Sequence, residues 1–544
     1  MRRPLILLAA GVLLLALLVR VGHGVGRGGV WRDEANAYFV VQESGSVGQL
    51  LHNLKVESSP PLQPLLEYAM QRMAGARLGP LRALSILFGT LTVLGVLLVG
   101  WRAFSPACGI LAALLAAVSP YMIRISGELR NYPLFGMLAV VHAGAFLRYV
   151  ERRGMKEACL WGLSAAALAY SHYYAFPIVF CAGLAALASA PRRAEVVRCI
   201  AAGAIFLIAY APWLPTFLLQ FRSDLQPWYL PRTDAAGLLT VLRLPLGRAG
   251  TYLLLAALLS AALSLRWSAG SGEGPRGVVR LRFWSLVALG AAPTALAWVL
   301  QVYRGAFEER YLVATVVPLL PAACLHWSTM FRGSPLALPL PWRARPLELH
   351  GATRRRIAWT LLAAALVTQY LDPARWLRPS SPAREFAALV ERSARPDDLI
   401  WIFPAPYASS FNLHFTGPQK QLAFPFRGRV TRVAWIALRE REQDPVVIQA
   451  FLDELARHLD RGGRVWALFV ESLHLDEGWS FSSGPAPADS SRLARAEYHV
   501  HRQALRLLYA RAKVAGWWDR PHHDFHEGMV LVLFAPGSAT FRVR

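Results

Sequence analysis

The chain contains a series of long apolar segments, and these constrain its fold more than any other feature. A helix needs about 20 mostly apolar residues to cross the hydrocarbon core of a membrane. Only 17% of the 544 residues are charged, whereas soluble domains carry about 25%. The sequence therefore predicts an α-helical polytopic membrane protein with about eleven transmembrane helices, and it excludes an ordinary soluble enzyme. The predicted helices cover residues 4–22, 81–101, 107–121, 132–150, 158–171, 174–190, 196–221, 250–265, 283–303, 311–328 and 357–371.

The positive charge of the chain is concentrated in its membrane half. Lys and Arg outnumber Asp and Glu by 58 to 34 overall, by 35 to 15 in residues 1–371 and by 23 to 19 in residues 372–544. Basic residues of this kind collect in cytoplasmic loops and at anionic lipid headgroups. No basic segment interleaved with aromatic residues indicates a groove for nucleic acid. We therefore expect contact with membrane lipid, a cytoplasmic N-terminus and no nucleic-acid partner.

The loops between the predicted helices orient the chain. No small-residue cleavage site follows residues 4–22, so this segment is interpreted as a retained helix and not as a signal peptide. Segments 158–171 and 174–190 are interpreted as two helices, because a single crossing would place basic loops outside. This topology places three parts outside: the long first loop 23–80, the short loop 122–131, and everything after the last helix.

The residues after position 371 have a different character. Three apolar runs, 398–403, 464–470 and 529–534, are typical of buried strands, and helical patterns cover 445–460 and 491–513. Strands that alternate with helices predict a C-terminal extracytoplasmic α/β domain over residues 372–544, with a partly parallel sheet. The glycine pair that follows the first of these helices is typical of a helix end, and it does not form a phosphate-binding fingerprint.

Two adjacent carboxylates, Asp33 and Glu34, follow the first predicted helix. Carboxylates close to a membrane surface are candidates for general acid–base chemistry or ion binding. The alternative is structural, since Asp33 is a suitable N-cap for a helix over residues 35–41, with Glu34 favoured by the helix dipole. The two interpretations are compatible.

Further polar groups recur where predicted helices meet the outside. One external boundary carries Glu128, Arg130 and Tyr132, and a later one carries Arg310 and Tyr311. The alternative for such groups is a surface ion pair or an arginine that anchors a helix at the interface.

Together these residues form an ordered pattern on the external side. It resembles the GT-C superfamily of polyprenyl-phosphate-sugar-dependent glycosyltransferases, of the protein mannosyltransferase type (glycosyltransferase family 39-like). The departure is at Ser59, because relatives often have His or Lys before the double proline; His52 or Lys55 could replace that basic residue. The features that carry the resemblance are Asp33-Glu34, Pro60-Pro61-Leu62, the set Ser126, Glu128, Arg130 and Tyr132, and Arg310-Tyr311 leading to Pro318.

The resemblance implies a GT-C fold, a catalytic membrane domain over residues 1–371, and a location in the bacterial inner membrane. It implies transfer of a monosaccharide, with inversion, from a polyprenyl-phosphate carrier to a hydroxyl of a glycan, lipid or protein acceptor at the outer face. The chemistry leaves a divalent cation open as a cofactor and does not require one. The alternative functions are a transporter or flippase of a lipid-linked sugar, and a structural subunit.

The resemblance also implies roles for single residues, which we expect to converge in one external cavity. A base must take the acceptor proton, and cations must hold the phosphate. A guanidinium presents a fork of donors to phosphate oxygens. The implied roles are base for Asp33, orientation or sugar or metal binding for Glu34, phosphate clamps for Arg130 and Arg310, positioning for Glu128, and hydrogen bonding or sugar stacking for Tyr132 and Tyr311.

Two other clusters are interpreted without a catalytic role. His522, His523, Asp524 and His526 resemble metal ligands, but no distant partner set has recognisable spacing, which favours solvated loop histidines. The segment 171–174 lies at an external helix boundary, where an aromatic anchor is favoured and contact with the donor headgroup is the alternative.

Overall fold

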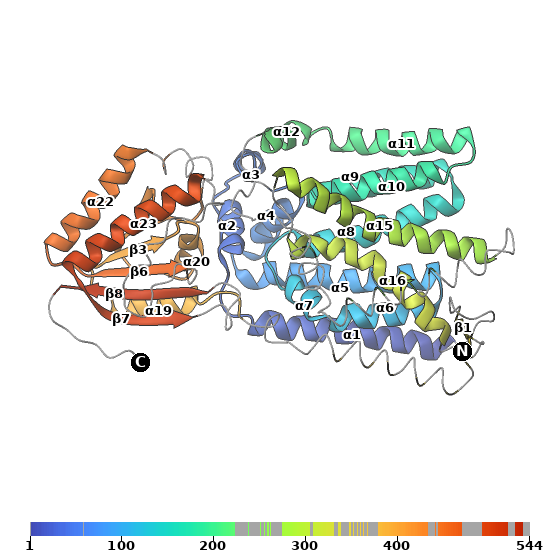
Figure 1. The fold of residues 1–544 in the computed structure, drawn as a ribbon, viewed down its shortest axis with the longest axis horizontal. Helices are drawn as coiled ribbons and strands as arrows, with labels where there is room; N and C mark the ends of the chain where they lie inside the picture. The colour runs from blue at the N-terminus through green and yellow to red at the C-terminus, as the bar shows by residue number, and fades with distance from the viewer. Residues whose placement is uncertain are drawn as a thin grey trace. The chain divides into compact units, whose positions relative to one another are not determined.

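The structure is a computed structural model (Figure 1). It describes residues 2–57, 59–222, 275–304, 308–330, 379–433, 444–470, 492–520 and 528–536, with two short strands and isolated residues between these ranges. The chain divides into two compact units, which are described separately. The first comprises residues 1–24, 59–219 and 230–376, and the second comprises 25–58, 220–229 and 377–544.

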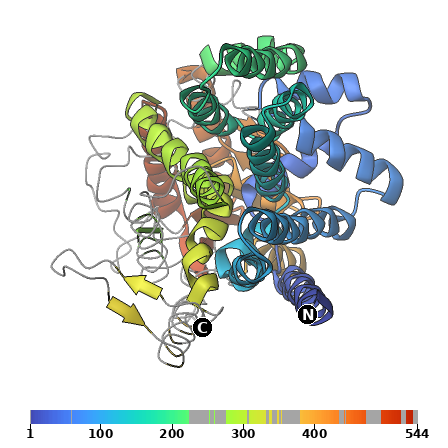
Figure 2. The same cartoon turned by 90° about the vertical axis from the view of Figure 1, so that its right-hand side faces the viewer.

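The first unit is a bundle of helices. Figures 1 and 2 show them side by side, with α5 packed on α6 and α8, α9 packed on α8 and α11, and α15 packed on α16. The elements that lie wholly or mainly in this unit are α1 (Arg2–Gly26), α4 (Leu62–Ala74), α5 (Leu78–Ala103), α6 (Pro106–Val118), α7 (Pro120–Ser126), α8 (Tyr132–Arg152), α9 (Met155–Ser171), α10 (Ala175–Ala188), α11 (Arg193–Tyr210), α12 (Leu214–Arg222), α15 (Pro275–Arg304), the 3-10 helix η2 (Glu309–Leu312), α16 (Val313–Met330), β1 (Leu336–Leu338) and β2 (Leu347–Leu349).

The predicted membrane helices are largely present, and two of them are bent. Residues 107–121 divide into α6 and α7, bent by 67°, and residues 196–221 divide into α11 and α12, bent by 81°. Prolines explain both bends, because Pro120 and Pro212 cannot donate a helical hydrogen bond at the break. Within the described residues, four helices are long and apolar enough to cross a membrane, or six if each bent pair is one span.

Other predictions for the bundle have different outcomes. The break between the segments 158–171 and 174–190 is confirmed, since α9 ends at Ser171 and α10 begins at Ala175. The predicted helices 250–265 and 357–371 lie outside the described residues, apart from isolated positions. The count of eleven crossings therefore stays a prediction.

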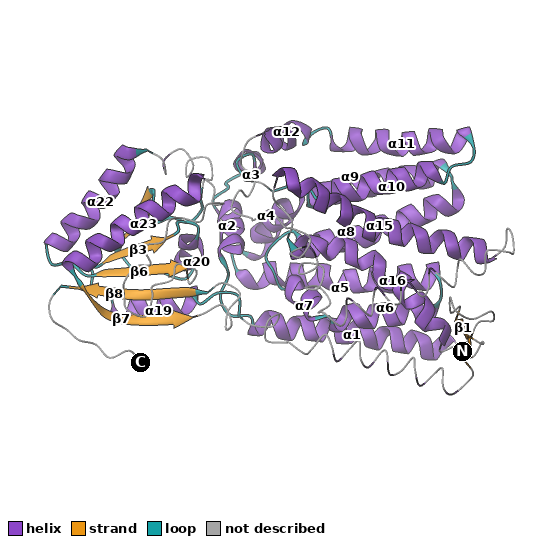
Figure 3. Cartoon of the chain, viewed as in Figure 1, coloured by secondary structure: helices purple, strands orange, loops and turns teal. Residues whose placement is uncertain are grey.

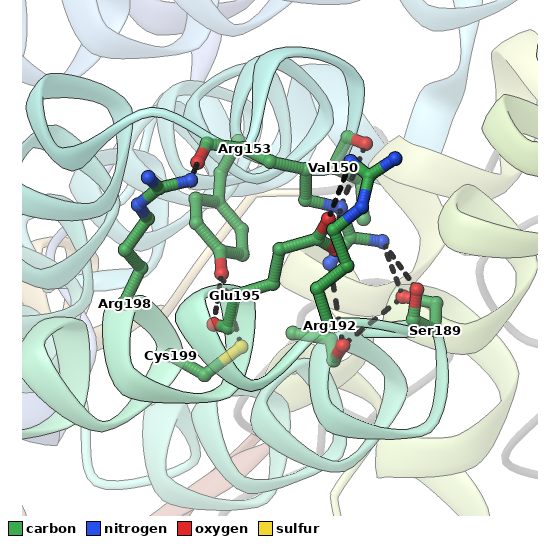
Figure 4. Close-up of polar contacts among 9 residues, drawn as sticks. Val150, Arg153, Ser189, Arg192, Glu195, Arg198 and Cys199 are labelled. Atoms are coloured by element: carbon green, nitrogen blue, oxygen red, sulfur yellow. Dashed lines mark hydrogen bonds and ion pairs between the residues drawn. The ribbon is translucent and has the colours of Figure 1, made fainter.

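Helix α8 connects two chemically different ends of the bundle. Its 21 residues extend for about 30 Å. Beyond its C-terminus, Arg153 has a left-handed backbone (φ 52°) and its guanidinium donates to the carbonyls of Val150 at 3.0 Å, Ala186 at 3.3 Å and Ser189 at 3.0 Å. Glu195 of α11 lies 3.7 Å from the same guanidinium, and further arginines surround it (Figure 4). This cluster ties α8, α10 and α11 together.

The second unit is a six-stranded sheet with helices on both faces (Figure 3). The strand order is β5-β4-β3-β6-β8-β7, in which β3 is parallel to β4 and β6, and β8 is antiparallel to β6 and β7. Its elements are α2 (Arg32–Gln42), α3 (Val47–Leu54), α19 (Ala383–Ser393), β3 (Leu399–Phe403), α20 (Tyr407–Asn412), β4 (Lys420–Ala423), β5 (Phe426–Arg427), α22 (Pro445–Asp460), β6 (Val465–Val470), α23 (Arg492–Arg511), β7 (Lys513–Arg520) and β8 (Met529–Ala535).

Alternating residues of the central strands supply two cores. Ile400 and Trp466 face the core that includes α19 and α20, and Trp401 and Ala467 face the core that includes α22 and α23. The predicted strands, both helices and the partly parallel sheet are confirmed. The short strands β4 and β5 were missed, as was β7, whose first residue follows the helix α23 almost directly.

The boundary between the two units differs from the predicted division at residue 371. Residues 25–58, predicted as part of the first external loop, group with the C-terminal residues. Helix α2 packs on α20, and the side-chain oxygen of Asn36 accepts a hydrogen bond from the Val433 backbone at 3.0 Å. Glu43 pairs with Arg432 at 3.2 Å. These contacts join segments almost 400 residues apart in the sequence.

We expect Asp398→Ala to lower the free energy of unfolding of the α/β domain by about 3 to 5 kcal/mol. The buried carboxylate accepts hydrogen bonds from Arg464 at 2.6 and 2.9 Å, from the Trp466 indole at 2.8 Å and from the Arg395 backbone at 2.9 Å. Calorimetry of the full chain measures the change. Asp397→Ala, which removes the exposed neighbouring carboxylate, is the control and should leave the transition in place. Equal effects of the two substitutions would contradict the prediction.

Candidate functional site

One part of the candidate site lies in the first unit, where α7 ends and α8 begins. Glu128, in the loop between these helices, is fully buried and pairs with Arg124 at 3.1 Å. The same guanidinium reaches Glu309 of η2 at 3.0 Å. Tyr121 donates its hydroxyl to the backbone carbonyl of Glu309 at 2.6 Å. The start of α8 is therefore fastened to a segment about 180 residues further along the chain.

A buried arginine of α1 forms hydrogen bonds to the residues that precede this loop. Arg20 donates to the side-chain hydroxyl of Ser126 at 3.0 Å and to the carbonyls of Ala116 at 3.1 Å and Ala117 at 3.0 Å. Those carbonyls belong to the last turn of α6, which lacks helical partners for them. Arg20 thus satisfies the end of α6 and positions Ser126, the residue with which the predicted motif begins.

Aromatic rings gather around η2. The ring of His172 lies 4.7 Å from that of Phe135 and 5.0 Å from that of Tyr311, measured between centroids. Tyr311 is also 4.8 Å from Tyr174 and 6.1 Å from Tyr132. The cluster combines residues from α8, from η2 and from the turn between α9 and α10.

Two predicted phosphate-binding arginines act on this cluster. Burial, and then the positive charges of Arg130 and Arg310, lower the pKa of His172 to about 3. Arg310 also lies over the ring of Tyr132, with 5.8 Å between its central carbon and the ring centroid, and pairs with Glu308 at 3.0 Å. Guanidiniums from two segments far apart in the sequence therefore act electrostatically on one imidazole. That imidazole is neutral at ordinary pH, so it does not add a third positive charge.

The structure thus brings several predicted residues together at one end of the bundle. They are Arg130, Tyr132, Arg310 and Tyr311, with Glu128 linked to them through Arg124 and Glu309. The sequence placed Glu128 beside Arg130, whereas the ion pair found for it is with Arg124.

The acidic pair lies at the start of α2, in the second unit. Glu34 is fully buried, pairs with the buried Arg27 at 3.3 Å and accepts a hydrogen bond from the Trp31 backbone at 3.3 Å. Arg27 also donates to the hydroxyl of Ser380. Glu34 thus closes the first turn of the helix from its third position, as in a capping box.

Asp33 differs from its neighbour in exposure. Asp33 is not the N-cap that the structural alternative predicted, because Trp31 occupies that position. The backbone amide of Trp31 donates its hydrogen bond to Glu34. The Asp33 side chain is 18% exposed and lies 3.5 Å from Arg32. Arg32 in turn donates to the Tyr407 hydroxyl at 3.0 Å and lies over that ring. Asp33 is thus a partly solvated carboxylate on a rigid helix. Its predicted convergence with the arginines of the first unit stays a prediction.

The remaining predicted ligands are solvent-exposed. His52, in the last turn of α3, and Lys55, which follows that helix, both face water. Among the described residues, no group of three or more His, Cys, Asp or Glu side chains could hold a metal ion. His522, His523, Asp524 and His526 lie outside the described residues.

Sequence reasoning missed three residues that organise the site. Arg124 lies inside a helix and faces Glu309, and Arg27 lies in a glycine-rich segment and faces Glu34. His172 was interpreted as part of an aromatic anchor, with headgroup contact as the alternative, and it lies at the centre of the ring cluster. Its position at a helix break was the available signal.

One part of the chain, which includes several residues of the candidate site, matches a known protein family. The family model described as dolichyl-phosphate-mannose-protein mannosyltransferase matches residues 58–215, which include Glu128, Arg130, Tyr132 and His172. A search of curated proteins returns no significant match.

Two solved structures share the fold along most of the chain. ArnT from Cupriavidus metallidurans, bound to undecaprenyl phosphate, has a TM-score of 0.53 at 11% identity and covers 98% of both chains. The oligosaccharyltransferase AglB from Archaeoglobus fulgidus, in complex with an inhibitory peptide and a dolichol-phosphate, has a TM-score of 0.53 at 12% identity. That match covers 94% of this chain and 79% of AglB. Identities this low establish the fold alone.

The chain therefore shares its fold with these two solved structures. The resemblance to the GT-C superfamily, of protein mannosyltransferase type, is confirmed by the family match and the two structural matches.

We expect Glu128→Ala to destabilise the first unit by about 3 kcal/mol, because it leaves the buried Arg124 guanidinium with one fewer counter-charge. Glu309→Ala removes the second carboxylate that pairs with the same guanidinium, but that side chain is 24% exposed, and we expect less than half the effect. Thermal unfolding of the detergent-solubilised protein compares the two variants. A larger loss for Glu309→Ala would contradict the assignment of Glu128 as the anchor.

Proposed function

We propose that the protein transfers a monosaccharide, with inversion, from a polyprenyl-phosphate carrier to an acceptor hydroxyl at the outer face of a bacterial inner membrane. The observation that carries the proposal is the Arg310 guanidinium over the Tyr132 ring, 5.8 Å from its centroid, within the ring cluster around His172, on which the charges of Arg130 and Arg310 both act. Two forked cations suit a phosphate, and the surrounding rings suit a sugar. Tyr132 and Tyr311 supply such rings, with hydroxyls that can donate to the donor.

The reaction needs few groups. The bond between the anomeric carbon and the phosphate oxygen breaks while the acceptor oxygen bonds to that carbon, and the polyprenyl phosphate leaves with the electron pair. Asp33 takes the acceptor proton, and Arg130 and Arg310 stabilise the charge on the departing phosphate. A single displacement inverts the anomeric centre. Glu34 acts as a positioning residue, because its pair with Arg27 holds the helix that carries Asp33.

The lipid nature of the donor is supported by the proteins of similar fold. ArnT was solved with undecaprenyl phosphate and AglB with a dolichol-phosphate. We extend the polyprenyl-phosphate carrier to this chain on the basis of the arginine pair. His52 and Lys55 are assigned no more than a contact with the phosphate from the exposed end of α3.

The proposed orientation follows from the two ends of α8. Its N-terminus carries the aromatic and arginine site, and its C-terminus carries the arginine cluster around Glu195, about 30 Å away. Lys and Arg are enriched in cytoplasmic loops. We therefore assign the Glu195 end to the cytoplasm and the candidate site to the outer side, with eleven crossings and an extracytoplasmic α/β domain.

A flippase for a lipid-linked sugar is the second candidate function. Transporters place their polar groups near the middle of the bilayer, at broken helices. The ring cluster and both arginines lie at helix ends, and this favours the enzyme.

We expect Asp33→Asn to reduce turnover by about 100-fold or more, the usual contribution of a general base. The amide keeps the shape of the side chain, and the group is partly exposed, so folding should be unaffected. Transfer of radiolabelled sugar from a polyprenyl-phosphate donor, with thermal unfolding as a parallel readout, measures both quantities. Asp453→Asn on the surface of α22 is the matched control. Full activity of the Asp33 variant would remove this carboxylate from the mechanism.

Replacement of either proposed phosphate-binding arginine should weaken binding of the lipid donor. We expect Arg310→Gln and Arg130→Gln each to weaken binding of undecaprenyl phosphate by about tenfold or more, since a charge-assisted hydrogen bond contributes about 1.5 to 3 kcal/mol. Arg192→Gln, which removes an 83% exposed guanidinium at the other end of the bundle, should bind as the parent does. Equal binding by all three variants would exclude the arginine pair as the phosphate site.

A further inference from the structure

The α/β domain contains a cavity that the proposed reaction does not use. It has a volume of about 660 Å³ and lies between α19 and β7, with Gly28 and Gly29 and the chain before α19 as its wall. The cavity belongs wholly to the second unit. Its charged and aromatic lining residues are Arg384, Glu385 and Arg392 of α19, and Trp518 and Arg520 of β7.

The helix contributes one stripe of side chains to this cavity. Ala383, Phe386, Ala387 and Val390 form its buried face in the core of the domain. Ala388 and Arg392, four and eight residues after Arg384, also line the cavity. Residues at this spacing lie on the same side of a helix. Two exposed guanidiniums, Arg384 and Arg392, therefore stand at either end of one helical stripe.

The strand supplies a platform and a third guanidinium. Trp518 stacks on the buried Trp466, with 5.5 Å between ring centroids and 22° between ring planes, so its ring is held in place. Arg520 pairs with Glu385 at 3.0 Å across the cavity edge. Three guanidiniums and one carboxylate give the lining an excess of two positive charges.

The wall on the other side requires glycine. Gly28 has a φ of +73°, a conformation that residues with a side chain rarely adopt. A Cβ atom on Gly29 would lie 2.6 Å from the Ser381 carbonyl oxygen. The two glycines thus let one backbone segment pack directly on another, which fixes the shape of the cavity.

We propose that this cavity binds an anionic saccharide, whose ring packs on Trp518 and whose acidic group binds the guanidiniums of Arg384, Arg392 and Arg520. The C–H face of a sugar ring is apolar enough to pack on an indole, and carboxylate or phosphate oxygens match the fork of an arginine. Charged side chains around the cavity disfavour an acyl chain. The role of the saccharide as acceptor rests on the proposed function, whereas its binding does not.

Calorimetric titration of the full chain in phosphatidylcholine nanodiscs tests the proposal. The probes are trigalacturonic acid and the neutral maltotriose, which have the same number of rings. We expect trigalacturonic acid to bind about tenfold or more tightly than maltotriose, because charge-assisted hydrogen bonds form only with the acid. Equal binding of the two sugars, or no binding of the acid at millimolar concentration, would overturn the proposal.

The variants locate the binding site. Arg384→Gln with Arg392→Gln should weaken binding of the acidic sugar about tenfold or more, and both side chains are exposed, so folding is preserved. The matched control, Arg457→Gln with Arg506→Gln, removes two exposed guanidiniums from α22 and α23, which cover the opposite face of the sheet. Parallel losses in both double variants would indicate general charge attraction and overturn the site. Trp518→Leu should weaken binding of the sugar while leaving inorganic phosphate binding unchanged.

Two arms distinguish the source of the saccharide. A soluble acidic glycan is represented by trigalacturonic acid, and a glycolipid headgroup by a ganglioside in the nanodisc. Loss of either interaction in the Arg384 and Arg392 double variant supports the site, and phosphatidylglycerol nanodiscs test an anionic headgroup without sugar. Sugar transfer without binding of these probes would overturn this inference and leave the proposed function intact. Binding of the probes without transferase activity would overturn the assignment of the saccharide as the acceptor.

Discussion

The buried contact between Arg124, Glu128 and Glu309 is the constraint on which the candidate site depends. A buried charge without a counter-charge costs several kcal/mol, so each of these groups specifies the position of the others. Arg124 meets Glu128 at 3.1 Å and Glu309 at 3.0 Å. The contact joins the loop before α8 to η2, and the residues that follow these two points are Arg130 and Arg310. Placement of the two phosphate-binding candidates is therefore a consequence of one ion-pair network.

A second buried ion pair has the same function in the other unit. Arg27 and Glu34, both almost completely removed from water, fix the beginning of α2. The helix then presents Asp33 with partial exposure. In both units a buried acidic side chain has an ion-pair partner, and a more exposed charged residue follows or precedes it closely in the sequence. Exposure thus distinguishes Asp33, which is partly solvated, from Glu34, which is fully buried.

Local patterns predicted much of the fold, and distant contacts account for the rest. Strands such as 398–403 are visible as apolar runs, and the break at His172 is visible from the loop charges. By contrast, the hydrogen bond between Asn36 and Val433 spans almost 400 residues, and nothing in the composition of residues 25–58 indicates that they join the α/β domain. Candidate residues at helix ends were also predicted from local sequence patterns. Their partners Arg124 and Arg27 were missed, because pairing across a fold leaves no periodic signal in the sequence.

The distribution of arginine indicates how one residue type can serve three purposes in the same chain. Beyond α8, Arg153 satisfies backbone carbonyls and the carboxylate of Glu195, so its charge is used internally. Near His172, the charges of Arg130 and Arg310 act on one imidazole, although Arg310 is also paired with Glu308 at 3.0 Å. On α19, the exposed Arg384 and Arg392 line a cavity together with Trp518, and water screens their charges. The local partners of each arginine, and not the total charge of +24, therefore distinguish these three groups.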